Sequence, residues 1–232
     1  MLTLESVHAH YGKSHVLQGV DLRVDDGEAV ALLGRNGVGK TTTLRTIMGL
    51  MPPSDGSVTF DGARLDRTQA HKIPRLGLGY VPQGRRIFPK LSVFENMCIG
   101  LDRKPDQRAL QGIYERFPVL KERAGQQGGT LSGGEQQMLA IARSLVMNPK
   151  IILFDEPTEG IMPKLVAGLR DEIRAICEAG VSVLLVEQNV RVALAICNRV
   201  YIMEKGVISY GGVSQELREK PEIVHRYLGI AL

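Results

Sequence analysis

Residues Gly34 to Thr41 have the types and the spacing that hold the phosphate chain of a nucleotide. Their sequence is Gly-Arg-Asn-Gly-Val-Gly-Lys-Thr; it follows an apolar run and precedes a helical pattern, the context in which this motif binds phosphate. Glycines let the backbone curl so that N–H groups point at phosphate oxygens, and the helix N-terminus adds partial positive charge. We expect Lys40 to reach the β- and γ-phosphates and the Thr41 hydroxyl to bind Mg²⁺.

Two carboxylates, Asp155 and Glu156, follow the apolar run from Ile151 to Phe154. A carboxylate at position 155 can hold Mg²⁺ through water, opposite Thr41. Glu156 can polarise a water molecule for in-line attack on the γ-phosphate, as a general base. The plainer interpretation is that both carboxylates face solvent at a strand end, but the phosphate-binding motif upstream favours the catalytic one.

The segment Leu131-Ser132-Gly133-Gly134-Glu135 opens a predicted helix. A hydroxyl, small residues and free N–H groups at a positive helix end repeat the physics of the phosphate loop. An ordinary helix cap would have the same composition, so the segment gains its meaning from the other two motifs.

Together, the three motifs resemble the ATP-binding subunit of an ABC transporter, over nearly the whole chain. The resemblance implies that Glu156 is the catalytic base and that Ser132-Gly133-Gly134 binds the γ-phosphate held by a second subunit, with two ATP molecules between two subunits paired head to tail. It further implies that Gln83 senses Mg²⁺ and the attacking water, and that Tyr11 stacks on adenine. As lone residues, Gln83 would be a surface loop residue and Tyr11 a core residue.

The resemblance gives ATP and Mg²⁺ as cofactors. The expected catalytic residues are Glu156, Gln188 and Gln83, and the expected Mg²⁺ ligands are Thr41, Gln83 and Asp155. The expected nucleotide-binding residues are Tyr11, Gly34, Arg35, Asn36, Gly37, Val38, Gly39, Lys40, Thr41, Thr42, Ser132, Gly133, Gly134 and Glu135.

Two segments depart from the pattern of the broad family. Where most members continue Ser-Ala-Leu-Asp after Thr158, this chain has Glu-Gly-Ile-Met, so Met162 replaces an aspartate that contacts the opposing subunit. Where most have Thr-His-Asp after Val186, this chain has Glu-Gln-Asn, so Gln188 replaces a histidine that touches the γ-phosphate. A glutamine amide can donate a hydrogen bond but cannot become cationic. Hydrolysis is therefore expected to be slower, unless Gln188 suffices.

Both departures look like one subgroup, the ATPases of importers for branched-chain amino acids, which has close relatives for urea and short amides. The segment 81–89 supports this subgroup. The segment 221–229 favours the amino-acid branch, whereas 33–39 and 157–161 favour the urea branch. The resemblance implies that the solute does not touch this subunit, so no pocket here is expected to encode it.

We therefore expect an ATP-hydrolysing subunit that energises an importer, most directly for branched-chain amino acids. The implied partners are membrane permease subunits and a second ATPase subunit, in a heterodimer or a homodimer. One alternative is a soluble ABC ATPase acting on DNA or ribosomes, but such proteins usually carry coiled-coil insertions or tandem units. A second alternative is an ATP-dependent clamp without useful turnover, which the changes at Gln188 and Met162 support.

Composition and charge narrow the partners. The net charge is +4 with scattered Lys and Arg, so nucleic acid is not an expected partner. No run approaches the ~20 apolar residues that span a bilayer, and the N-terminus lacks a signal-peptide pattern. We expect a cytoplasmic protein, peripheral on the inner face of the membrane. The three cysteines have no metal-like spacing and are expected to be reduced core residues.

The predicted fold is a single α/β domain over residues 1–232, a phosphate-loop ATPase core with a mostly parallel sheet. The apolar runs Ala29–Leu33, Ile151–Phe154 and Val181–Val186 lack polar alternation, which indicates buried parallel strands. An N-terminal antiparallel β lobe is also expected. Within it, Asp26-Gly27 predicts a hairpin between the runs Val20–Val24 and Ala29–Leu33.

Helices are predicted for Lys40–Leu50 and for Pro163–Ala179, with an apolar stripe on the second. A helical subdomain of about residues 88–146 is inserted, and the capping box Ser92-Val93-Phe94-Glu95 marks a helix start in it. The segment from Glu204 to Leu232 is predicted as a strand and turn followed by one short helix. The surface that couples to a membrane partner is expected around Gln83 to Glu95, including Phe88.

Overall fold

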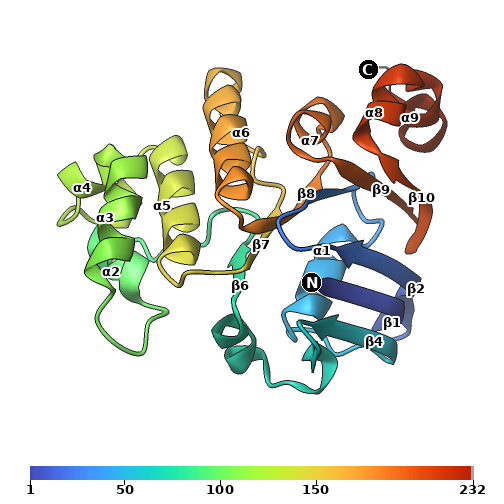
Figure 1. Ribbon diagram of the computed structural model, residues 1–232, viewed down its shortest axis with the longest axis horizontal. Helices are drawn as coiled ribbons and strands as arrows, with labels where there is room; N and C mark the ends of the chain where they lie inside the picture. The colour runs from blue at the N-terminus through green and yellow to red at the C-terminus, as the bar shows by residue number, and fades with distance from the viewer. Residues whose placement is uncertain (231–232) are drawn as a thin grey trace.

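Two sheets of different character organise the chain, and the computed structural model describes residues 1–230 of it (Figure 1). The smaller sheet is antiparallel, with strand order β2-β1-β4-β5. Its strands are β1 (Leu2–Tyr11), β2 (Ser14–Val24), β4 (Asp55–Phe60) and β5 (Ala63–Arg64). The predicted antiparallel β lobe is thus confirmed.

The larger sheet has the order β10-β9-β3-β8-β7-β6, and every neighbouring pair is parallel except β9 with β10. Its strands are β3 (Ala29–Leu33), β6 (Leu78–Val81), β7 (Ile151–Asp155), β8 (Ser182–Glu187), β9 (Arg199–Glu204) and β10 (Val207–Val213). The central strands β3, β7 and β8 are buried along their whole length, so the prediction of buried parallel strands is confirmed.

The predicted hairpin at Asp26-Gly27 is wrong. The turn exists, since Glu28 N donates to Asp25 O at 3.2 Å, but it carries the chain from one sheet to the other. β2 alternates buried and exposed residues and pairs with β1, whereas β3 is buried on both faces and finds parallel partners in β8 and β9. A turn motif is a local signal and does not report which strands a buried run will join.

The helices divide between a helical group and the faces of the large sheet (Figure 1). The helical group lies at the end of the molecule away from the antiparallel sheet. It contains α2 (Val93–Cys98), α3 (Gln107–Arg116), α4 (Pro118–Glu122) and α5 (Gly133–Leu145). The other helices are α1 (Lys40–Ile47), α6 (Pro163–Glu178), α7 (Val190–Ile196), α8 (Ser214–Glu219) and α9 (Pro221–Leu228).

The two faces of β3 belong to two different apolar clusters, as the period of two in a strand requires. Ala29, Ala31 and Leu33 pack in the cluster that contains α6, α7 and the helical group. Val30 and Leu32 pack in the cluster that contains α1 and the antiparallel sheet. β3 therefore lies between the two apolar clusters.

Helix boundaries follow local capping signals. The capping box at Ser92 and Glu95 is present and starts α2, as predicted. α1 ends at Ile47 rather than Leu50, because Gly49 takes a left-handed conformation at φ 65°. The C-terminal segment forms two helices, α8 and α9, in place of the single predicted one. No helix within residues 1–230 is long and apolar enough to cross a membrane.

The turn between β9 and β10 holds the phosphate loop. Gly206 N donates to Val38 O at 2.9 Å, and Gly206 O accepts from Gln18 N at 2.9 Å. Gly206 has φ 86°, and a Cβ there would overlap the backbone oxygen of Val16. Only glycine fits this close approach of three segments.

We expect Gly206→Ala to lower the free energy of unfolding by about 2 kcal/mol or more, because the new methyl group meets backbone rather than a flexible side chain. Gly112→Ala is the control: it lies inside α3 with open space around it, so it should be neutral or stabilising by up to about 1 kcal/mol. Urea unfolding of both variants measures the difference. Equal stabilities would contradict the packing of this turn.

Candidate active site

The phosphate loop runs from the end of β3 into α1. Gly37 and Gly39 have φ values of 78° and 118°, so the loop uses conformations that favour glycine. No side chain caps the start of α1, where Gly39 is the N-cap residue. The N–H groups of this first turn therefore stay available to an anion.

Lys40 is buried at the start of α1 and is held by three oxygens. Its Nζ donates to Gly34 O at 2.9 Å and to Arg35 O at 3.1 Å. It also lies 3.1 Å from Oε1 of Glu156, and the two side chains are only 4% and 7% exposed. A buried charge is tolerated when it is paired in this way.

Glu156 lies directly after β7 in a left-handed conformation, with φ 48°. Its N–H donates to Val186 O at 2.9 Å, which ties it to β8. Its Oε2 accepts from Gln188 Nε2 at 2.7 Å and from Gln83 Nε2 at 3.5 Å. Three expected site residues from distant parts of the chain, Lys40, Gln83 and Gln188, thus meet at this one carboxylate.

Asp155 faces the hydroxyl of Thr41. Thr41 Oγ1 donates to its Oδ1 at 2.9 Å, and the Tyr80 hydroxyl donates to its Oδ2 at 3.2 Å. Burial raises the pKa of Asp155, and these two hydrogen bonds oppose the rise. Burial and the Asp155 carboxylate also raise the pKa of Tyr80. A hydroxyl, a carboxylate and the nearby amide of Gln83 are oxygen donors that fit Mg²⁺.

Two adjoining cavities contain these groups, and both are lined by Thr41 and Gln83. The first, of about 220 Å³, is lined by Val16, Asn36, Gly37, Gly39, Lys40, Thr41, Thr42, Gln83 and Glu156. The second, of about 230 Å³, is lined by Thr41, Arg45, Leu50, Tyr80, Pro82, Gln83, Arg86 and Asp155. The phosphate loop, Gln83 and the carboxylates of Asp155 and Glu156 therefore line adjoining polar cavities.

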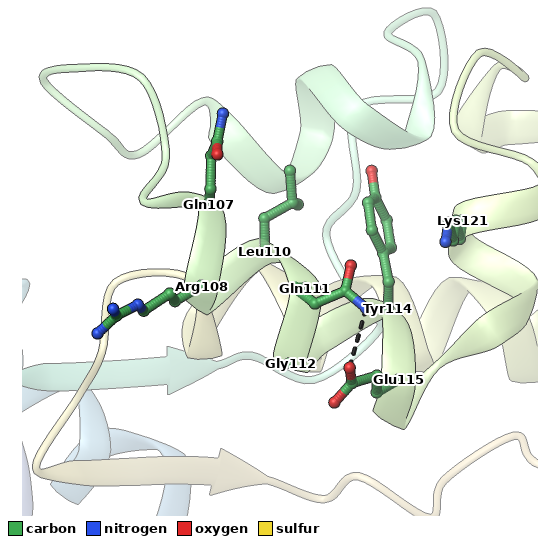
Figure 2. A pocket seen from close by; sticks show the side chains of 8 residues that line it. All are labelled: Gln107, Arg108, Leu110, Gln111, Gly112, Tyr114, Glu115 and Lys121. Atoms are coloured by element: carbon green, nitrogen blue, oxygen red, sulfur yellow. Dashed lines mark hydrogen bonds between the residues drawn. The ribbon is translucent and has the colours of Figure 1, made fainter.

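A larger cavity, of about 680 Å³, lies elsewhere, along α3 and at Lys121 of α4 (Figure 2). Gln111 donates to Glu115 there at 2.9 Å, one turn further along the same helix. None of the expected site residues lines this cavity, so size alone does not identify the active site.

Tyr11 and the start of α5 lie outside the two polar cavities. Tyr11 ends β1, is 45% exposed, and its hydroxyl accepts from Arg45 Nη1 at 3.2 Å. Tyr11 is therefore not a core residue. At the start of α5, Ser132 and Glu135 form a capping box, and Glu135 pairs with Arg123 at 3.1 Å. The Glu135 carboxylate is therefore engaged in fixing the helix start.

Sequence reasoning missed the residues that connect the motifs. Glu159 Oε2 accepts from Gln83 Nε2 at 2.6 Å, and Glu187 is buried between two loops. Arg85 donates to Gly160 O at 3.1 Å and lies against Gly133. The only sequence signal for Glu187 is its position as a charged residue directly after an apolar run.

Arg143 of α5 also connects the loop after β6 to the helical group. It donates to Arg86 O at 2.8 Å and to Arg85 O at 3.1 Å. Both of these arginines have positive φ, at 66° for Arg85 and 47° for Arg86. The guanidinium of Arg143 also lies 5.9 Å from the centre of the Phe88 ring.

A phosphate loop between a central parallel strand and a helix is the arrangement of a nucleotide-binding α/β protein. The sequence profile of the ABC transporter family matches residues 17–159, so the chain belongs to this family. It has the ATP-binding cassette fold and is an ATPase.

Two sequence relatives and one solved structure are similar to this chain. The chain is 40% identical over 232 residues to the high-affinity branched-chain amino acid transport ATP-binding protein BraG of Pseudomonas aeruginosa, covering 99% of this chain and 100% of the relative. It is 36% identical to the lipopolysaccharide export system ATP-binding protein LptB of Escherichia coli, covering 98% and 97%. A dimeric ATP-binding cassette in a post-hydrolysis state, bound to ADP and Pi, superimposes with a TM-score of 0.81 at 25% identity, covering 92% and 99%.

We expect Lys40→Ala to abolish measurable ATP binding, because a buried ammonium beside the phosphate loop is lost. Lys104→Ala, which removes an exposed lysine before α3, is the control and should bind ATP as the wild type does. Titration with a fluorescent ATP analogue gives both affinities. Wild-type ATP affinity and turnover in Lys40→Ala would show that the phosphate chain binds elsewhere.

Proposed function

We propose that this chain is the ATP-hydrolysing subunit of an importer for branched-chain amino acids. The observation that carries the hydrolytic part is the convergence of Lys40, Gln83 and Gln188 on the Glu156 carboxylate. The nearly complete coverage of BraG at 40% identity supports the import of branched-chain amino acids. The relative LptB, at 36% identity, belongs to an export system and supports the opposite direction of transport. Urea and short amides are the competing solutes.

In the proposed reaction, the phosphates of ATP lie on the phosphate loop and compete with Glu156 for the ammonium of Lys40. The released carboxylate then accepts a proton from water as the water oxygen attacks the γ-phosphorus. The bond from that phosphorus to the bridging oxygen breaks, which yields ADP and phosphate. Mg²⁺, held by Thr41, Asp155 and Gln83, would neutralise charge on the phosphate oxygens.

Gln188 has a role that does not need charge. Its Nε2 donates to Glu156 Oε2 at 2.7 Å, so the amide orients the carboxylate directly. In the proposed mechanism the same amide donates to the γ-phosphate once ATP is bound. A neutral donor suffices here because Lys40 already supplies the positive charge.

The second phosphate-binding segment, Ser132-Gly133-Gly134, lies outside the two cavities of its own subunit. This placement supports a dimer in which each subunit completes the site of the other. The dimeric cassette with ADP and Pi is consistent with such an arrangement. We propose a heterodimer with a second ATPase subunit in the assembled importer, on the cytoplasmic face of the membrane.

We expect Glu156→Gln to keep ATP binding and to slow hydrolysis by about 10²–10⁴-fold, because the general base is lost while the shape is kept. The ATP-bound dimer should accumulate in Mg²⁺ buffer and disappear in EDTA. Phosphate release and light scattering measure the two effects, with Glu172→Gln on α6 as the carboxylate control. Hydrolysis at the wild-type rate would remove Glu156 from the mechanism, and monomers alone, also with the natural partner present, would exclude the shared site.

An apolar groove of about 570 Å³ borders the loop that carries Gln83. Leu50, Phe88 and Ile99 are 61%, 45% and 48% exposed at this groove. Arg143 also lines it and holds the backbone carbonyls of that loop. We propose that a cytoplasmic helix of a permease subunit docks here, because the groove is apolar, open and linked to the active site.

We expect Phe88→Asp to leave ATP binding by the isolated subunit intact and to abolish assembly with the permeases. Val213→Asp is the control, since Val213 is 57% exposed on β10, away from the groove. Co-purification and uptake of labelled leucine, with labelled urea in parallel, measure assembly and solute together. Normal uptake by a complex carrying Phe88→Asp would refute the docking surface. If the wild-type complex takes up urea but not leucine, urea would replace branched-chain amino acids as the proposed solute.

A further inference from the structure

Glu187 is a buried carboxylate at the last position of β8, and the proposed mechanism does not use it. Glu187 is 2% exposed. Within residues 1–230 no cation lies within ion-pairing distance of it, so its charge is compensated by hydrogen bonds. Burial raises the pKa of Glu187, and the donors around it oppose that rise.

The two oxygens of this carboxylate serve two different loops. Oε1 accepts from Thr158 N at 3.1 Å and from Thr158 Oγ1 at 2.7 Å. Oε2 accepts from Gln188 N at 3.1 Å and from Asn189 N at 3.3 Å. Thr158 belongs to the loop that begins with Glu156, and Gln188 to the loop after β8. One side chain thus joins, through hydrogen bonds, the two loops that carry Glu156 and Gln188.

The hydrogen bonds of Glu187 support an unusual backbone conformation at Glu156. Glu156 has φ 48°, a conformation that non-glycine residues rarely adopt and that neighbouring contacts must maintain. The Glu156 N–H bond to Val186 O fixes one flank, and the Glu187 contacts to Thr158 fix the other. On the opposite loop, the main chain of Gln188 is anchored by the same carboxylate.

The neutral side chain of Gln188 explains why such an anchor is needed. A cationic donor would be drawn to Glu156 by charge, and that attraction acts over several ångströms. An amide depends on a directional hydrogen bond, here 2.7 Å long, and so depends on the placement of its own backbone. Glu187 supplies that placement through the Gln188 N–H.

We propose that Glu187 is a positioning residue for ATP hydrolysis: it holds the loops after β7 and β8 so that Gln188 orients the Glu156 carboxylate. The proposal rests on the roles given above to Glu156 and Gln188. It assigns Glu187 and Gln188 to one functional unit, in which the first fixes the backbone of the second.

The test compares Glu187→Gln, Gln188→Ala and the double variant by steady-state kinetics and ATP titration. Glu187→Gln keeps the side-chain volume but presents an NH₂ group to N–H donors, so kcat should fall by about tenfold while the Kd of ATP changes by less than about twofold. In the Gln188→Ala background the same change should lower kcat by a clearly smaller factor, because only the support of the Glu156 loop through Thr158 remains to be lost. Glu172→Gln is the control: Glu172 lies on α6, pairs with Arg116 of α3, and its variant should keep the wild-type kcat.

Thr158→Val provides a second variant that removes only the hydroxyl donor and retains the backbone bond. It should lower kcat in the same direction and by a smaller factor, which keeps the proposal testable if Glu187→Gln fails to fold. Wild-type kcat in both Glu187→Gln and Thr158→Val, or effects that multiply fully in the double variant, would overturn the positioning role. Wild-type kcat in Gln188→Ala would instead show that the proposed mechanism fails at Gln188, and this inference with it.

Discussion

The buried pair of Lys40 and Glu156 is the interaction around which the site is arranged. Removing two charges from water is costly, and the cost is offset only when both partners are placed accurately and their remaining hydrogen bonds are made. Lys40 is placed by the carbonyls of Gly34 and Arg35, and Glu156 by amide donors from Gln83 and Gln188. The phosphate loop and both carboxylate loops therefore depend on one another.

The parallel sheet makes this pairing possible. β3, β8 and β7 are neighbours in the sheet, although β7 and β8 follow β3 by more than half of the chain. Because the carboxyl ends of parallel strands meet at one edge, the residues that follow each strand are brought together there. The turn at Gly206 adds a further restraint from β9 and β10, through its bond to Val38.

Local chemistry in the sequence was enough to predict several parts of this arrangement. The phosphate loop, the buried strands and the start of α2 at Ser92 each follow from glycine spacing, uninterrupted apolar runs or a capping box. The partners of the motifs were not predictable in this way. Glu159 and Tyr80 acquire their roles from side chains that are distant in the sequence, and the strand order that brings them together leaves no local trace. The mistaken hairpin at Asp26-Gly27 has the same origin, since a turn signal carries no information on sheet membership.

The contacts of the Arg143 side chain connect the active site to the exposed groove. It contacts the carbonyls of Arg85 and Arg86 on one side and the Phe88 ring on the other. A single guanidinium is therefore shared by the active-site loop and the exposed groove. Linkage is reciprocal: if ATP binding shifts this loop and changes the affinity of the groove for a partner, the partner changes the affinity for ATP by the same factor. A partner bound at the groove proposed above would then be an allosteric effector of nucleotide binding, and the size of the effect would be the same whichever site is filled first.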